Sequence, residues 1–216
     1  MRRSIVILMM ALFIASCKKE GSNPVESIGT QEKVTDYYPL EVGNYWIYEY
    51  YTSDSTLNFI DQHLIDSVYV EKDSIYNGNV YAVVWRSAYW NFSMSLMRDS
   101  SDYLINNAGQ KIFTINQDNN NLVDRYLPYP DSIFHDTWKM KNSDSICNVP
   151  AGQYQAKYLV GTLTSLVPKS PSMTKRNFYY AYVKGIGLVY ERLGYLSGPD
   201  YLEERLIRYH VNGKTN

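Results

Sequence analysis

The sequence predicts an all-β domain, built as an antiparallel meander with little helix. Tyrosine is unusually abundant, at 22 of 216 residues, and aromatic residues favour strands. Asn77-Gly78, placed between Tyr76 and Val80, is a strong signal for a two-residue β-hairpin turn. Hardly any segment combines helical spacing of apolar residues with helix caps. These three observations favour sheet over helix throughout the folded part.

The first predicted strand follows an abrupt change of character at Tyr37. A turn at Gly43-Asn44 precedes a long aromatic run over residues 45–52. Side chains alternate along a strand, which places Trp46, Tyr48 and Tyr50 on one face and Tyr45, Ile47 and Tyr51 on the other. Because both faces are apolar or aromatic, we expect both to be covered.

Further strands are predicted along the rest of the chain, at residues 65–71, 80–87, 89–97, 103–106, 111–115, 122–126, 153–163, 177–183 and 188–196. Residues 127–136 contain Pro128 and Pro130, so we expect an irregular crossing segment there. The strand at 153–163 alternates, which predicts one wet face. That face carries Gln153, Gln155 and Lys157, opposite Tyr154, Ala156, Tyr158 and Val160.

The last element is ambiguous in the sequence. Asp200 and Glu203 have the spacing of a helix capping box, and Leu202, Leu206 and Tyr209 lie near helical spacing. We favour a strand, because a terminal strand would complete the meander.

The N-terminus has the features of an export signal. Arg2 and Arg3 precede an apolar run at residues 5–14, which is too short to span a bilayer. Ile14-Ala15-Ser16-Cys17 resembles the bacterial lipobox, so we predict cleavage after residue 16 and lipidation of Cys17; an ordinary cleaved signal with a chance cysteine is the alternative. Residues 17–36 are then a lipidated cysteine with a polar, flexible tether, and residues 37–216 a single domain. This predicts a lipid-anchored protein of the cell envelope, in the outer membrane, with the leaflet left open.

Several function classes find no support in the residues. The formal net charge of −1 is too balanced for a nucleic-acid surface, and there is neither a glycine-rich phosphate loop nor a CxxC pair. His63, His135 and His210 are far apart and outside any metal-ligand spacing. We therefore expect no catalytic residue, no metal site and no cofactor. Cys147 is expected to be a buried thiol without an intramolecular partner.

Five triplets repeat an Asp-Ser pair followed by an aliphatic residue or threonine. They centre on Ser55, Ser67, Ser74, Ser132 and Ser145. The triplet resembles the acceptor of a general O-glycosylation system of one group of Gram-negative bacteria, which acts on exported proteins. Asp-Ser also ends turns, and an aliphatic residue often begins a strand, so the repeated turns of a meander explain the pattern equally well.

Three segments look like recurring signatures of small Gram-negative lipoproteins, and they occur in the usual order. They are the PLEVGNYW stretch at residues 39–46, VPAGQY at 149–154 and GIGLV at 185–189. Such proteins are similar in outline to the half-barrel fold of the outer-membrane lipoprotein carrier and receptor group. The resemblance implies a curved sheet or half-barrel and an apolar cavity, and it brings no assigned catalytic residues.

Binding is the activity that we expect, and not catalysis. The ligand would be apolar or sugar-like and would contact Trp46, Tyr48 and Tyr50, because aromatic rings combine apolar area with a polar handle. The alternative is that this face is simply core. Two other functions stay open, namely a hydrolase with a site built from scattered Asp, Glu and His residues, and a structural subunit whose Tyr-rich face contacts an envelope partner.

Overall fold

The computed structural model describes residues 32–54, 56–88, 91–118, 120–129, 132–167, 174–195 and 198–216. The predicted signal, Cys17 and the tether up to residue 31 lie outside these ranges, so their predictions stay predictions. Within the described ranges, no helical segment has the length and hydrophobicity needed to cross a membrane.

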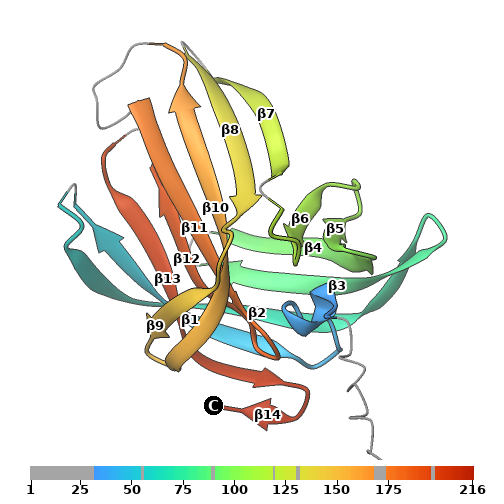
Figure 1. Ribbon diagram of the computed structural model, residues 1–216. Coiled ribbons are helices and arrows are strands. Elements are labelled where there is room, and N and C mark those ends of the chain that lie inside the picture. Colours follow the sequence, from blue (N-terminus) through green and yellow to red (C-terminus); the bar gives the residue numbers. More distant parts are fainter. Residues whose placement is uncertain are drawn as a thin grey trace, which may run out of the picture. The chain divides into compact units, whose positions relative to one another are not determined.

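Antiparallel strands make up nearly all of the regular structure, which confirms the predicted fold class (Figure 1). One short 3-10 helix, η1 (Val34–Asp36), precedes them. The strands are β1 (Tyr45–Ser53), β2 (Phe59–Tyr76), β3 (Asn79–Ala88), β4 (Asn91–Ser100), β5 (Tyr103–Asn106), β6 (Lys111–Thr114), β7 (Asn121–Tyr129), β8 (Ser132–Met140), β9 (Ser145–Val149), β10 (Gly152–Ser165), β11 (Lys175–Val183), β12 (Gly187–Gly194), β13 (Tyr201–Val211) and β14 (Lys214–Thr215).

The strands form one sheet in the order β6-β5-β4-β3-β2-β1-β13-β12-β11-β10-β8-β7, with β9 paired to β10 and β14 to β13. Each half of this order is a meander, and β1 joins the halves by pairing with β13. The ambiguous last element is therefore a strand, β13, as predicted. It pairs with the first strand in the middle of the sheet. The edge strands β6 and β7 contact each other, so the sheet is curled and its two edges lie close together.

The β2–β3 hairpin turns at Asn77-Gly78, as the sequence predicts. Tyr76 pairs with Asn79, and both turn residues have positive φ, at 49° and 75°. We expect Gly78→Val to destabilise the domain by about 1–3 kcal/mol, because a β-branched residue resists this conformation. Urea unfolding would measure the loss, and Gly78→Asn is the control that tolerates positive φ. Equal stability of the valine variant and the parent would contradict the expectation.

The crossing segment predicted at residues 127–136 is wrong. Pro128 lies inside β7 and pairs with Ile133 at the start of β8, so the segment is a second hairpin. β7 is the last strand of the sheet order, and proline is tolerated on an edge strand because its missing N–H leaves no ladder bond unmade. β2 is also much longer than predicted, and β9 was not predicted.

The prediction that one face of β10 is exposed to solvent is only partly correct. Gln153 and Gln155 are exposed, but Lys157 is 92% buried and the following residues on its side, Leu159 and Leu163, belong to the core. The strand changes partner along its length, from β9 at residues 152–156 to β8 at residues 159–165. The face that is exposed at Gln153 and Gln155 is therefore buried from Lys157 onwards.

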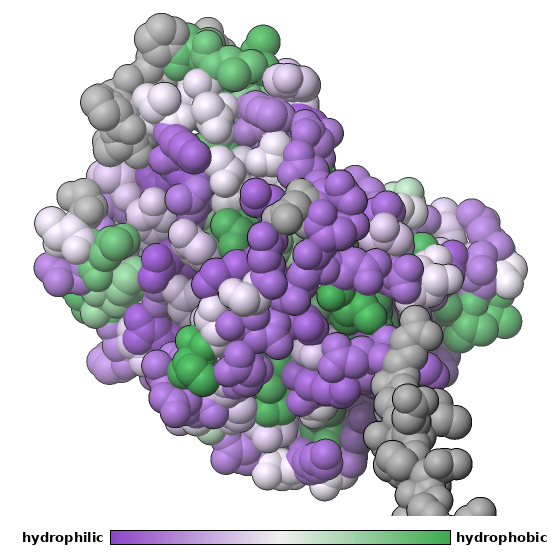
Figure 2. Space-filling view, viewed as in Figure 1, coloured by the Kyte–Doolittle hydropathy of each residue, from purple (hydrophilic) through white to green (hydrophobic). Residues whose placement is uncertain are grey.

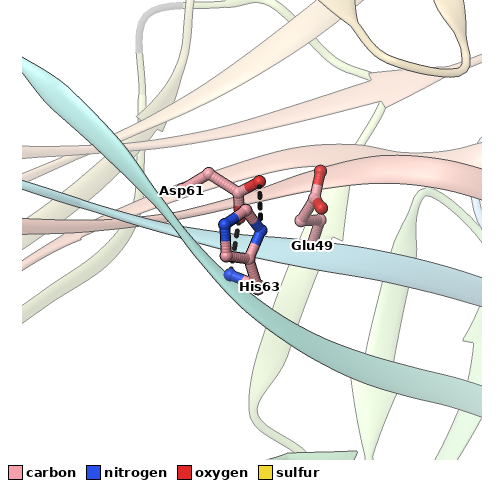
Figure 3. Close-up of side chains that lie close together, drawn as sticks. All are labelled: Glu49, Asp61 and His63. Carbon is pink, nitrogen blue, oxygen red and sulfur yellow. Dashed lines mark hydrogen bonds and ion pairs between the residues drawn. The ribbon is translucent and has the colours of Figure 1, made fainter.

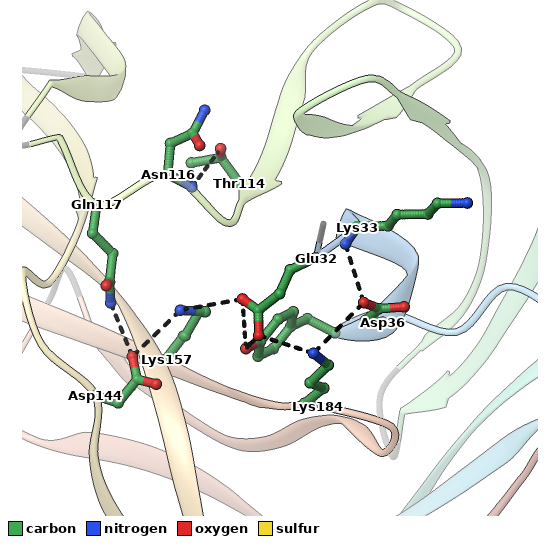
Figure 4. A network of polar contacts seen from close by, with 10 residues as sticks. Glu32, Lys33, Asp36, Thr114, Asn116, Gln117, Asp144, Lys157 and Lys184 are labelled. Atoms are coloured by element: carbon green, nitrogen blue, oxygen red, sulfur yellow. Dashed lines mark hydrogen bonds and ion pairs between the residues drawn. The ribbon is translucent and has the colours of Figure 1, made fainter. Parts of the chain in front are cut away.

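The folded part includes residues that we assigned to the tether. Val34 is fully buried in η1, where it packs with Tyr37 and Phe113. Glu32 accepts hydrogen bonds from Lys184 Nζ at 2.9 Å and from the Tyr37 hydroxyl at 3.1 Å, and the Lys184 bond contributes most to lowering the Glu32 pKa (Figure 4). This network also joins Lys157 to Asp144 at 3.6 Å. It fixes the point at which the N-terminal segment joins the sheet.

The molecular face in Figure 2 is mostly hydrophilic, with small, separate hydrophobic patches. Some large apolar side chains are exposed, among them Ile75 and Val80 at the β2–β3 hairpin. Apolar residues scattered singly over a protein surface are normal. The face in view therefore offers no broad apolar area for a partner.

Candidate functional site

The aromatic face of β1 points into the curled sheet. Trp46, Tyr48 and Tyr50 are 2–3% exposed. Trp46 Nε1 donates to the carbonyl of Ile186 at 2.6 Å, and the Tyr48 hydroxyl donates to the carbonyl of Leu188 at 2.8 Å. Burial raises the pKa of Tyr50 to about 12. The predicted binding face is therefore packed against the β11–β12 hairpin, while the opposite face of β1 is only half-buried.

A cavity of about 600 Å³ lies inside the curled sheet. Its wall combines Gln110 to Ile112 of β6 and the preceding turn with Leu122 to Arg125 of β7, so it bridges the two edges of the sheet. The deeper wall is aromatic and aliphatic, with Tyr38, Met97, Trp138, Leu159, Tyr180, Tyr182 and Leu188. Burial raises the pKa values of Tyr180 and Tyr182 well above the ordinary value. These tyrosines therefore stay neutral and act as hydroxyl donors or acceptors.

A second cavity of about 260 Å³ lies beside the first and shares Tyr38, Arg86, Met97 and Leu188 with it. Trp46 and Tyr48 line this smaller space. Two of the three predicted ligand residues thus reach a cavity, but Tyr50 lines neither. We refer to both cavities together as the inner cavity.

One polar cluster stands in the inner wall. Arg86 Nε bonds Asp66 Oδ2 at 2.7 Å and Nη1 lies 3.3 Å from Glu191 Oε2, while Nη2 also pairs with Glu204. The three carboxylates are 0–6% exposed. Burial raises the pKa of Asp66, although Arg86 opposes the shift. Burial alone would lower the pKa of Arg86, but the negative charges of Glu191 and Asp66 have the larger effect and raise it.

The opening between β6 and β7 carries mixed charge. Lys111, Asp124 and Arg125 line it. Arg125 Nε donates to Asp136 Oδ2 at 2.9 Å, and His135 Nε2 lies 2.8 Å from Asp124 Oδ1. These bonds hold the β7 side chains in place at the entrance.

The histidines do not assemble into one site. His135 stacks on Tyr126, and His210 stacks on Tyr45. His63, Asp61 and Glu49 bring three ligand-type atoms within 4.8 Å of one another (Figure 3). His63 Nδ1 lies 3.0 Å from Asp61 Oδ2, and Glu49 accepts from the Tyr51 hydroxyl at 2.8 Å. The group is an open surface cluster with its own internal bonds.

The Asp-Ser triplets occupy different environments. Asp66 is fully buried, and the hydroxyl of its neighbour Ser67 bonds that of Ser87 at 2.6 Å. Ser145, at the start of β9, accepts a hydrogen bond from Lys141 Nζ at 2.8 Å. Ser74 is half-buried near the C-terminal end of β2. Ser55 and the side chain of Ser132 lie outside the described residues. Glycosylation of these serines stays a prediction.

Sequence reasoning missed the main features of the inner wall. Register shifts between β11 and β12 so that Tyr182 pairs with Leu188 and Ala181 with Tyr190, which leaves Val189 as an extra residue. Such a bulge reverses the facing of the residues beyond it. Leu188 and Glu191 therefore both line the inner cavity, whereas strict alternation would separate them. Cys147 is buried, as predicted, and burial raises the pKa of its thiol.

No protein-family model matches the sequence, and no curated protein matches it. Two solved structures are similar. One is a candidate exported protein with a YmcC-like fold from Bacteroides fragilis NCTC 9343, with 13% identity, a TM-score of 0.42, and coverage of 80% of this chain and 97% of that one. The other is a candidate lipoprotein from Parabacteroides distasonis ATCC 8503, with 12% identity, a TM-score of 0.44 and the same coverage. At these scores the fold assignment rests on the strand pairing itself.

Proposed function

We propose that this chain is a lipid-anchored protein of the cell envelope that binds a small, mostly apolar ligand inside its curled sheet and does not transform it. The inner cavity carries the proposal. Its main part, at about 600 Å³, falls within the usual size of ligand pockets, which are mostly apolar with a few placed polar groups. Arg86 and Glu191 are such groups beside the aromatic wall.

Binding in this cavity is tested with a fluorescent apolar probe, N-phenyl-1-naphthylamine, titrated into the domain of residues 32–216. Leu122 lines the cavity near its opening, so Leu122→Trp should fill part of the space and weaken probe binding by roughly tenfold or more. Val80→Trp adds the same ring at an exposed position on the β2–β3 hairpin and should leave binding unchanged. Equal affinity of both variants would contradict binding inside the sheet, provided that both unfold near the parent temperature.

The anchor part of the proposal rests on Cys17 and the residues before it. We expect Cys17→Ala to leave the precursor unprocessed and to abolish labelling with radioactive fatty acid, because no other residue offers the thiol for acylation at that site. Two or more acyl chains hold a protein firmly on a membrane, whereas one chain holds it marginally. Normal labelling of the variant would overturn the lipid anchor. Separation of inner and outer membranes on a density gradient then tests the outer-membrane assignment.

A further inference from the structure

A groove of about 450 Å³ lies on the opposite face of the sheet from the inner cavity. We call it the outer groove. It is lined by Phe59, Cys147, Asn148, Tyr158, Tyr179, Tyr190, Arg192, Glu203 and Arg205. Successive residues of a strand face opposite sides, and Leu159 and Glu191 line the inner cavity while Tyr158 and Arg192 line the outer groove. The two spaces are therefore separated by the sheet.

Strand β9 forms one wall of the outer groove. The β9–β10 hairpin is tied to β13 by a hydrogen bond from the Ala151 amide to the carbonyl of Leu206 at 2.9 Å. Cys147 and Asn148 of β9 therefore line the groove together with Arg205 of β13. The groove is thus built from the five consecutive strands β9 to β13 and from Phe59 of β2.

A buried carboxylate organises the floor of the groove. Glu203 is 1% exposed, and its Oε1 atom accepts from Arg192 Nε at 2.7 Å and from the Tyr190 hydroxyl. Its Oε2 atom accepts from Arg205 Nε at 2.8 Å and from Nη2 at 2.5 Å. Both oxygens of Glu203 are therefore occupied, so the carboxylate orients the two guanidinium groups and has little capacity left for a ligand.

The guanidinium groups also lie against aromatic rings. Arg205 is 4.0 Å from the ring centre of Tyr51, and Arg192 is 5.0 Å from that of Phe59 and 5.5 Å from that of Tyr179. The arginine side chains remain 24% and 27% exposed, and among the described residues no hydrogen-bond partner takes Nη1 of either one. Donors fixed in this way lose little freedom when they bind a ligand.

Charge and shape indicate the kind of ligand. The lining residues carry one more positive than negative charge, and Glu49 of β1 pairs with Arg205 across the two strands. Guanidinium groups bind carboxylates in a planar, bidentate manner, and aromatic faces stack on rings. Tyr179 also lines the wall, while the Tyr158 hydroxyl bonds the Cys147 thiol and Asn148 Oδ1 accepts from Gln153 Nε2 at 2.7 Å.

We propose that the outer groove binds an anionic saccharide, with a carboxylate of a sugar acid on Arg192 and Arg205 and its ring against the flanking aromatic side chains. The proposal is independent of the ligand of the inner cavity. A network of this kind is weak evidence for stability, since replacing a buried ion pair by apolar residues is often neutral. The partly exposed guanidinium groups at the open groove distinguish a binding site from internal packing.

Calorimetric titration with trigalacturonate, with neutral galactotriose as the comparison, tests this site. We expect trigalacturonate to bind and galactotriose to bind at least roughly tenfold more weakly. Arg192→Gln should weaken trigalacturonate binding by a similar factor. Arg208→Gln removes an exposed arginine of the same strand as Arg205 that does not line the groove, so it should leave binding unchanged.

Arg192→Gln removes one partner of a buried carboxylate and can lower stability. Tyr179→Ala is therefore the second variant, because Tyr179 is half-buried and its ring contacts the guanidinium group of Arg192. It should also weaken trigalacturonate binding while the domain stays folded. Equal binding of both trisaccharides, no binding of either, or unchanged affinity in the folded variants would overturn the proposal. Full displacement of trigalacturonate by an equal concentration of sulfate would show a plain anion site and also overturn it.

Discussion

Replacement of Arg86 by methionine should destabilise the domain by about 3–5 kcal/mol at neutral pH, which is the usual effect of removing one partner of a buried charge cluster. Arg86 is the cation that contacts Asp66, Glu191 and Glu204, and these carboxylates are almost fully buried. Without it, the sheet would have to bury their negative charges unpaired. Urea unfolding of parent and variant measures the difference in the free energy of unfolding.

The pH dependence of this loss gives a second observable. Burial already raises the pKa of Asp66 in the parent, and removal of Arg86 should raise it further. A carboxyl group whose pKa is raised in the folded state does not destabilise the fold below its ordinary pKa, where it is protonated in both states. The fold loses stability as the pH rises from the ordinary pKa through the folded pKa. The variant should therefore recover part of its deficit between pH 7 and pH 4.

Arg208→Met is the matched control for Arg86→Met. Arg208 is exposed on β13, and substitutions at such positions usually change stability by less than about 0.5 kcal/mol. An Arg86→Met variant that is as stable as this control, or whose deficit is the same at both pH values, would show that the three carboxylates do not depend on Arg86.

Tyr48→Ala should also lower stability by about 3–5 kcal/mol, the range for removing a buried aromatic side chain. Tyr48 is 2% exposed and bonds the carbonyl of Leu188. In a domain of this size the loss corresponds to a fall in melting temperature of roughly 10 °C. Differential scanning calorimetry measures it.

Tyr48→Phe separates the ring from the hydroxyl group. This variant keeps the packing and loses only the bond to Leu188, which is worth about 1 kcal/mol. An alanine variant that melts with the parent would mean that Tyr48 is a free binding-face residue, which is the first of the two interpretations that the sequence allows. A large loss supports the second interpretation, in which the face is core.

Local signals in the sequence were sufficient for much of the sheet. The alternating aromatic residues of β1 and the Asn77-Gly78 turn act through neighbouring residues, so they are visible without the fold. The segment around Pro128 was predicted wrongly because a strand accepts proline only at the edge of a sheet. The position of β7 at the edge depends on the order of the strands, which cannot be predicted from neighbouring residues alone.

The candidate sites were less predictable for a related reason. Arg86 lies on β3 and meets Glu191 of β12 and Glu204 of β13 only after the sheet has curled and β1 has paired with β13. The bulge at Val189 then places Leu188 in the inner cavity and Tyr190 in the outer groove, although the two residues would share a face in a regular strand. A bulge of this kind has no clear sequence signal.

Methyl NMR of the domain during titration with N-phenyl-1-naphthylamine tests the inner cavity most directly. Met97, Leu122, Leu159 and Leu188 line that cavity, while Ile75 and Val80 are exposed on the β2–β3 hairpin. Binding inside the sheet predicts that the methyl signals of the first group shift together, with one common dissociation constant, and that those of Ile75 and Val80 stay in place. Shifts confined to Ile75 and Val80, or no saturable shift in the cavity methyl groups, would contradict it.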